Sequence, residues 1–218
     1  MDYGSMLGSS FEYTKEAIWG KWMKWVLLII CSIIFPLIMG YMMEIYRGKD
    51  PAPELENWGK LFIDGLKLFI AELIYAIPLI IVALIFFGGA FAVAMSGGGS
   101  DAVIGAAFGT ALIGLLIIIV LSIIIGLIAI FGGIRLARTG AFGEAFNISA
   151  IMAHIGSIGW VDYIIAVIVL YVVLFVVSLV FGIIPFIGWL LSIIITPAFS
   201  ILAARYVTMI YDSAPAPA

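Results

Sequence analysis

The sequence predicts an all-α, polytopic integral membrane helix bundle, and three observations lead to this fold class. Of the 218 residues, 65% are hydrophobic and 11% are charged, and the mean hydropathy is +1.29. A typical soluble domain has about 45–50% apolar and about 25% charged residues, so this chain lacks the polar side chains that a soluble surface needs. Long apolar stretches also match or exceed the roughly 20 residues of a helical bilayer crossing. They lie at residues 61–95, 102–134, 160–184 and 189–211.

The chain before residue 61 is expected to lie at the membrane surface and partly within the bilayer. Residues 11–25 are predicted to form an amphipathic interfacial helix, since tryptophans alternate with lysines there, as is typical of the headgroup layer. A solvated N-terminal arm is the alternative. One face of this helix would carry Phe11, Ile18, Trp22 and Trp25. The apolar stretch 26–46 is broken by Pro36 and Gly40, so it is either one kinked crossing or a hairpin of two half-length helices that returns to its side of entry.

Short connections account for the remaining residues. A Gly-rich turn at 96–101 joins the first two long spans, and a turn at 185–188 joins the last two. Residues 143–156 are predicted to form a second interfacial helix, and the Pro-broken tail 212–218 is expected to be disordered. We expect residues 1–211 to form a single transmembrane helical domain. Charged residues precede the first apolar run and no small-residue cleavage site follows it, so no cleaved signal peptide is predicted.

The distribution of basic residues favours the returning hairpin at 26–46. If this stretch crosses once, Lys15, Lys21 and Lys24 lie on the side of the membrane opposite to the other seven Lys and Arg residues. If it returns, all ten lie on one side, and the two turns between the long spans, which have no basic residue, lie on the other. Because cytoplasmic loops are enriched in Lys and Arg, we expect a multi-pass protein of the cell membrane with both termini in the cytoplasm.

Five short segments are distinctive when they are taken together. They are Phe11-x-Tyr13-Thr14, Gly40-Tyr41, Asn57-Trp58-Gly59-Lys60-Leu61-Phe62-x-Asp64-Gly65-Leu66-Lys67, Gly143-Glu144-Ala145-Phe146 and Ile184-Pro185-Phe186-Ile187-Gly188. The chain resembles, over roughly residues 11–211, a prokaryotic and largely archaeal family of polytopic membrane proteins catalogued as domain of unknown function 4013. The third segment is the most specific. The resemblance implies an archaeal or bacterial cell membrane and no known activity, so it transfers no catalytic residue.

Four ionisable residues in or beside the apolar stretches are candidates for an intramembrane polar site, because a charge near the bilayer interior is costly and commonly functional. Glu72 has apolar neighbours on both sides, and Arg205 near the end of the last span could be its partner. Asp64 and Lys67, at i and i+3, can pair with each other. The functional interpretation is an ion or proton site between helices. The structural interpretation places Asp64 and Lys67 in the headgroup layer and has Glu72 and Arg205 fix the packing register.

Small residues recur along the span 102–134, mostly at steps of four, and form a predicted ridge for helix packing or oligomer contacts. They are Ala102, Gly105, Ala106, Gly109, Thr110, Gly114, Ser122 and Gly126. Small side chains let helix backbones approach closely, and this drives helix association in lipid. The ridge could face helices of the same chain or another subunit, and packing within the chain is favoured.

The remaining residue types predict anchoring rather than chemistry. Six tryptophans are expected to anchor the protein at the membrane interfaces, at Trp19, Trp22, Trp25, Trp58, Trp160 and Trp189. The sole cysteine, Cys31, excludes an intrachain disulfide, and the sole histidine, His154, stands beside no carboxylate or thiol cluster. We therefore expect no metal site and no cofactor. No P-loop, His-Glu-x-x-His or Gly-x-Ser-x-Gly motif occurs, and no run of Lys or Arg indicates nucleic acid.

Two functional hypotheses follow. The first is a non-enzymatic membrane-organising or scaffold protein, which binds membrane lipids through its surface helices and aromatic belts and forms homo-oligomers. The alternative is a small channel or transporter for an ion or small solute, with Glu72 and Arg205 near the pathway. An accessory role in a larger membrane complex is a third hypothesis. The scarcity of buried charge favours the scaffold hypothesis, and the intramembrane carboxylate of Glu72 favours the channel or transporter hypothesis.

Overall fold

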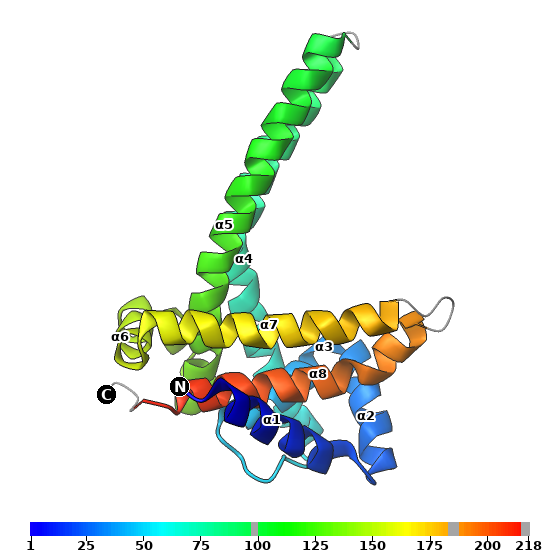
Figure 1. Ribbon diagram of the computed structural model, residues 1–218, viewed down its shortest axis with the longest axis vertical. Coiled ribbons are helices and arrows are strands. Elements are labelled where there is room, and N and C mark those ends of the chain that lie inside the picture. Colours follow the sequence, from blue (N-terminus) through cyan, green and yellow to red (C-terminus); the bar gives the residue numbers. More distant parts are fainter. Residues whose placement is uncertain (97–99, 183–187, 215–218) are drawn as a thin grey trace. The chain divides into compact units, whose positions relative to one another are not determined.

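The computed structural model describes residues 1–96, 100–182 and 188–214, and the regular structure in these ranges is entirely helical (Figure 1). This confirms the predicted all-α class. The elements are α1 (Tyr3–Ile18), α2 (Trp22–Ile33), α3 (Phe35–Tyr46), α4 (Trp58–Ser96), α5 (Asp101–Thr139), the 3₁₀ turn η1 (Phe142–Phe146), α6 (Ile148–Ile158), α7 (Trp160–Gly182) and α8 (Gly188–Tyr211).

The chain divides into two compact units. Residues 1–71 and 130–218 form the first unit, and residues 72–129 form the second. In the first unit α8 is the central helix, since α1, α2, α3 and α7 all pack against it. Figure 1 shows α1 and α7 running alongside α8. The core of this unit contains large, fully buried side chains from several elements, among them Tyr41, Phe131, Ile155, Tyr163 and Tyr206. The second unit is the hairpin formed by α4 and α5.

The long apolar stretches form the four expected candidate spans. By length and composition, α4, α5, α7 and α8 are each able to cross a membrane. Both α4 and α5 contain 39 residues. At a rise of about 1.5 Å per residue each is about 58 Å long, nearly twice the hydrocarbon thickness. Only part of each helix can therefore lie in the hydrocarbon layer. Residues 72–96 of α4, in the second unit, are long enough to cross alone.

The N-terminal segment differs from the single interfacial helix that we expected over residues 11–25. The first helix ends at Ile18, and Gly20 adopts a positive φ of 75° before α2 begins at Trp22. This break changes the phase of the helix, so Phe11 and Trp22 stay exposed while Ile18 is buried. The inward face of α1 instead contains side chains at a regular helical spacing, namely Ser10, Tyr13, Thr14, Ala17 and Ile18.

The break expected in the stretch 26–46 lies between α2 and α3, whose axes are bent by 119°. Pro36 is in the first turn of α3, where its missing N–H costs no helical hydrogen bond. This geometry is compatible with either a broken span or a re-entrant loop. The two helices also differ in their environment. Most of α3 is buried in the first unit, whereas α2 buries only Lys24, Leu28 and Cys31.

Two glycines allow α3 and α4 to approach closely. A Cβ atom at Gly65 of α4 would lie 1.6 Å from the Pro36 carbonyl oxygen, and one at Gly40 of α3 would lie 1.9 Å from the Leu61 carbonyl oxygen. Neither position has room for a side chain because the obstacle is backbone. The α3–α4 contact therefore depends on both glycines, and both lie in the segments that resemble the known family.

The remaining predictions fall partly outside the described residues. The second interfacial helix expected over 143–156 is divided into η1 and α6, and Asn147 caps α6 by accepting a hydrogen bond from the Ala150 N–H (3.2 Å). Residues 97–99 and 183–187 of the two predicted turns, and residues 215–218 of the predicted disordered tail, lie outside the described ranges.

Substitution of Gly65 by Ala is expected to destabilise the first unit by about 1–3 kcal/mol, the usual cost of overpacking, or more because the clash is with backbone. The matched control is Gly59→Ala on the same helix, where a Cβ meets nothing within 4 Å. Thermal unfolding of both variants in detergent measures the difference. Equal midpoints for the two would contradict the close approach of α3 and α4.

Candidate functional site

Two buried carboxylates of the first unit, Glu44 and Asp64, converge on Arg47, just after the end of α3. Its Nη1 donates to Glu44 Oε1 (2.5 Å), its Nη2 to Asp64 Oδ2 (2.6 Å), and its Nε to the carbonyl oxygen of Ala137 (3.1 Å). One guanidinium therefore joins α3, α4 and the end of α5. Glu44 is 4% exposed and Asp64 is 7% exposed. Because a buried carboxylate without a partner is very costly, Arg47 makes the burial of both tolerable.

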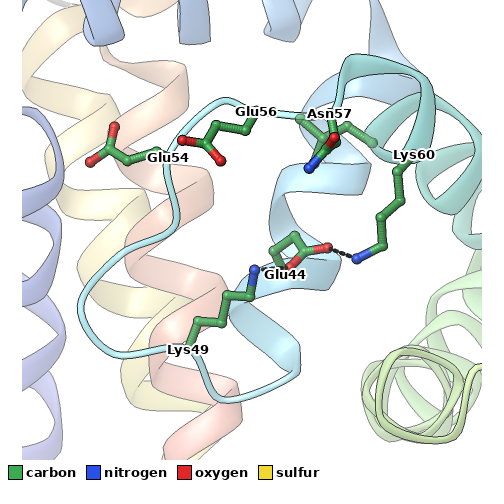
Figure 2. Close-up of a pocket in the computed structure, with 7 residues that line it drawn as sticks. Glu44, Lys49, Glu54, Glu56, Asn57 and Lys60 are labelled. Carbon is green, nitrogen blue, oxygen red and sulfur yellow. Dashed lines mark hydrogen bonds and ion pairs between the residues drawn. The ribbon is translucent and has the colours of Figure 1, made fainter.

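Glu44 also forms the floor of a small cavity of about 100 Å³ beneath the connector between α3 and α4. Figure 2 shows Lys49 and Lys60 converging on this carboxylate from either side. Lys60 Nζ lies 2.8 Å from Oε1, and Lys49 Nζ lies 2.5 Å from Oε2. Further lining residues are Glu54, Glu56, Asn57 and Leu61. Three cations thus neutralise one buried carboxylate, which gives Glu44 a structural role.

The connector between α3 and α4 is fixed to several helices. Arg205 of α8 binds Asp50 (2.6 Å) and lies over the Tyr13 ring, 4.6 Å from its centroid. The Tyr13 hydroxyl donates to the Lys49 carbonyl oxygen (2.9 Å). Burial raises the pKa of Tyr13 to about 12, so this phenol remains a donor at neutral pH. The Tyr41 hydroxyl donates to the Pro53 carbonyl oxygen (2.9 Å).

The start of α2 is held by the same connector. Lys24 Nζ lies 3.1 Å and Lys21 Nζ 3.4 Å from Glu54 Oε1. The N-terminal end of α2 and the C-terminal end of α3 therefore contact one short loop.

Of the four predicted polar residues, Asp64 and Lys67 lie together, whereas Arg205 has a different partner. Asp64 is part of the Arg47 cluster, and Lys67 Nζ lies 3.9 Å from Asp64 Oδ1. Arg205 is paired with Asp50. Glu72 is exposed and belongs to the second unit, and it has no ion pair within the described residues.

The predicted ridge on α5 does not lie on one face. Gly114 is the member that packs tightly, since a Cβ there would lie 2.2 Å from Phe86 Cβ of α4. At Gly105, Gly109 and Gly126 a Cβ would meet nothing within 4 Å. The reason is geometric: steps of four residues advance about 40° beyond a full turn, so the ridge winds around the helix. Only its middle faces α4, and its ends face outward, with Ala102, Ala106 and Ser122 exposed.

The predicted tryptophan anchors are largely on the surface. Trp19, Trp22, Trp58 and Trp160 are exposed. Trp25 is half-buried, and its Nε1–H donates to the Ile194 carbonyl oxygen (2.9 Å), which attaches α2 to α8. The Trp22 and Trp25 rings stack with centroids 5.6 Å apart. The side chain of Trp189 lies outside the described residues.

His154 is a core residue rather than a ligand. It is fully buried, its Nε2 lies 2.8 Å from the Tyr211 carbonyl oxygen, and its ring packs against Phe131 and Tyr211. Across the described ranges, no group of three His, Cys, Asp or Glu side chains is placed to hold a metal ion. Cys31 is buried.

The sequence interpretation missed the centre of the site. Glu44 and Arg47 were not singled out because they lie at the end of an apolar stretch, where interfacial charges are ordinary. The available signal was their i, i+3 spacing, which allows an ion pair at the end of α3, next to the charged residues Lys49 and Asp50. Their joint contact with Asp64 needs tertiary structure, since the connector and α4 bring it there.

The comparisons with known proteins identify the family of the chain and no function. The family model described as protein of unknown function (DUF4013) matches residues 25–186. No curated protein matches the chain. No solved structure matches it either.

Replacing Arg47 by Gln is expected to destabilise the first unit by about 3 kcal/mol or more, because two buried carboxylates lose their common partner. Lys67→Gln is the control, since Lys67 is half-exposed and its contact with Asp64 is long, and a pair of this kind contributes about 0–1 kcal/mol. Unfolding by heat in detergent compares them. In Arg47→Gln the Asp64 carboxylate keeps only its long contact with Lys67. Adding Asp64→Asn to Arg47→Gln should therefore restore part of the lost stability, and no restoration would contradict the electrostatic origin of the loss.

The stability of the η1 region is expected to depend on pH. Hydrogen bonds from Arg135 and from Asn147 lower the pKa of Glu144. A lowered folded-state pKa means that Glu144 stabilises the fold above its unfolded value of about 4.3 and that this contribution is lost as the pH falls through the folded-state pKa. The melting-temperature difference between the wild type and Glu144→Gln should therefore be largest at neutral pH and vanish in strong acid. A constant difference across this range would contradict the assignment.

Proposed function

The chain belongs to the family DUF4013, whose description names no function, and we propose that it is a non-enzymatic, homo-oligomeric protein that organises the cell membrane it spans. The observation that carries this proposal is the open surface of the α4–α5 hairpin. In an apolar segment of 18 residues in α4 only 11% of the residues are buried, and in a segment of the same length in α5 only 6% are buried. A helix pair with so little internal burial offers most of its surface to lipid or to other chains.

The small residues on the hairpin favour contact with other chains in addition to lipid. Gly105 and Gly109 face open space, as do Gly88 and Gly89 of α4. Glycine at a lipid-facing position provides no side chain for lipid contact, whereas between helices it permits close backbone approach. Association of hairpins from several copies would cover these positions.

Glu72 supports the same proposal. Its carboxylate is exposed at the beginning of the hairpin, and carboxylates in spanning segments generally face protein or water rather than lipid. A neighbouring copy would shield it. The alternative of a channel or transporter also rests on Glu72, because an unpaired carboxylate can bind an ion or a proton. Arg205, the second residue of that hypothesis, is held by Asp50.

Membrane lipids are the expected partner of the first unit. The outer side of α2 exposes a continuous set of large apolar residues, namely Trp22, Met23, Val26, Ile30 and Ile33. Its inner side is attached to α8 and to the connector. A short helix fixed on one side and apolar on the other suits one leaflet of the bilayer.

The contacts also support a common side for both termini. The Tyr3 hydroxyl donates to Asp162 at the start of α7 (2.6 Å), and Arg138 at the end of α5 binds Asp212 (2.8 Å). All ten Lys and Arg residues lie in the first unit. The cytoplasmic side is favoured by this basic content.

Substitution of Gly109 by Leu is expected to weaken assembly at least tenfold, equivalent to about 1.4 kcal/mol, without unfolding the chain. The control is Leu115→Ala, at an exposed position about 120° around α5 from Gly109. Particle mass by light scattering in detergent distinguishes them. If Gly109→Leu leaves the particle unchanged, and Glu72→Gln abolishes ion or solute flux in vesicles, the channel hypothesis replaces this proposal.

The topology is testable with single cysteines in a Cys31→Ser background. Cysteines at Lys15, Glu56 and Ser213 should react with a membrane-impermeant maleimide only after the cells are permeabilised, whereas one at Asp101 should react in intact cells. The first three positions share one side if α2–α3 returns. Reaction of the Lys15 and Glu56 positions from opposite sides would show that α2–α3 crosses the membrane once.

A further inference from the structure

A groove of about 710 Å³ lies between the first turn of α2 and residues 54–56 of the connector. We propose that this groove, the α2 groove, binds the phosphate headgroup of a membrane lipid, whose acyl chain follows the exposed face of α2. The inference rests on the proposed membrane-organising function and deepens it by naming the lipid chemistry.

The polar end of the α2 groove has the donors that a phosphate requires. The helix begins at Trp22 with no side-chain cap, and the first N–H bonded within the helix is that of Trp25, to the Lys21 carbonyl oxygen. The amide N–H groups at the start of a helix attract anions, and the helix dipole adds to this attraction. This helix has 12 residues, so the dipole is that of several turns.

Two lysines add positive charge at the same place. Lys21 is half-exposed, and the side chain of Lys24 is 7% exposed, yet both reach the single oxygen Oε1 of Glu54. An ammonium group has three donors, so this shared oxygen leaves donors of both lysines available to a second acceptor. A phosphate oxygen beside Glu54 would supply it.

Acidic residues are also present, which restricts the kind of headgroup. Glu54 and Glu56 both line the α2 groove. Glu54 is engaged by the lysines, whereas Glu56 is exposed and would oppose a second negative charge on the headgroup. A phosphodiester, with one negative charge, suits this environment better than a phosphomonoester with two.

The apolar side of the α2 groove has the character of an acyl-chain contact. Leu27 and Leu55 line it together with Trp22, which is 63% exposed, and Met23, which is 74% exposed. The exposed side chains of Val26, Ile30 and Ile33 continue this surface along α2. The helix is about 18 Å long, close to the thickness of one hydrocarbon leaflet. A polar end with two lysines, joined to an apolar strip of this length, matches an amphiphile rather than a free phosphate.

Native mass spectrometry of the full-length protein tests the inference, with phosphatidylglycerol as the phosphodiester probe and a monoglycosyl diacylglycerol as the probe without phosphate. The expected result is retention of phosphatidylglycerol in preference to the glycolipid, with affinity lowered at least fivefold by Lys21→Gln. Lys15→Gln is the matched control, because Lys15 is similarly exposed on α1 and is paired with Glu12. Glu56→Gln should strengthen phosphatidylglycerol binding.

Three outcomes would overturn the α2 groove as a lipid site. They are equal retention of both lipids, equal affinity in Lys21→Gln and Lys15→Gln, and displacement of the lipid by soluble glycerophosphoglycerol at matched concentration. The last result would indicate a site for the phosphodiester alone. Met23→Ser gives a second test, since it should weaken the binding of phosphatidylglycerol, and unchanged binding would contradict the acyl-chain contact. The same spectra report the oligomeric state. A monomer that retains the lipid would contradict only the proposed assembly. An oligomer that shows no lipid preference would contradict only lipid binding in the α2 groove.

Discussion

The fold depends on the need to neutralise two carboxylates that the first unit buries. Glu44 and Asp64 come from α3 and α4, and Arg47 binds both while donating to the carbonyl oxygen of Ala137 on α5. A single planar group with several fixed donors can make these contacts at once, which a lysine ammonium cannot reproduce in the same geometry. The close approach of α3 and α4 at Gly40 and Gly65 brings the two carboxylates within its reach.

This ionic centre determines what the rest of the first unit can do. Because the connector after α3 is fixed by Arg205, Tyr13 and Tyr41, the Glu54 carboxylate is available to hold the start of α2. The outer face of α2 is thereby presented to its surroundings as an apolar strip whose polar end carries two lysines. The polar chemistry of the protein thus concentrates in the first unit, and the α4–α5 hairpin contributes apolar surface and small residues.

The sequence predicted the helical class and the long spans well, since length and hydropathy alone decide them, and Pro36 correctly marked the break in residues 26–46. The sequence predicted less well which face of each helix points inward and which residues meet in the tertiary structure. The positive φ of Gly20 divides the expected 11–25 helix, and the ridge of small residues winds around α5 instead of forming one face. The Arg47 cluster could not be predicted because its members are far apart along the chain; Arg47 and Ala137, for example, are separated by 90 residues. Local spacing indicates only the Glu44–Arg47 and Asp64–Lys67 pairs.

The most direct test of the proposed function is the mass and shape of the wild-type particle extracted in native lipid, measured by native mass spectrometry together with single-particle imaging. Assembly through open hairpin faces predicts a closed or extended particle of several copies, with the α4–α5 hairpins in contact between chains. A monomeric particle, or a compact dimer enclosing a polar cavity at Glu72, would contradict it.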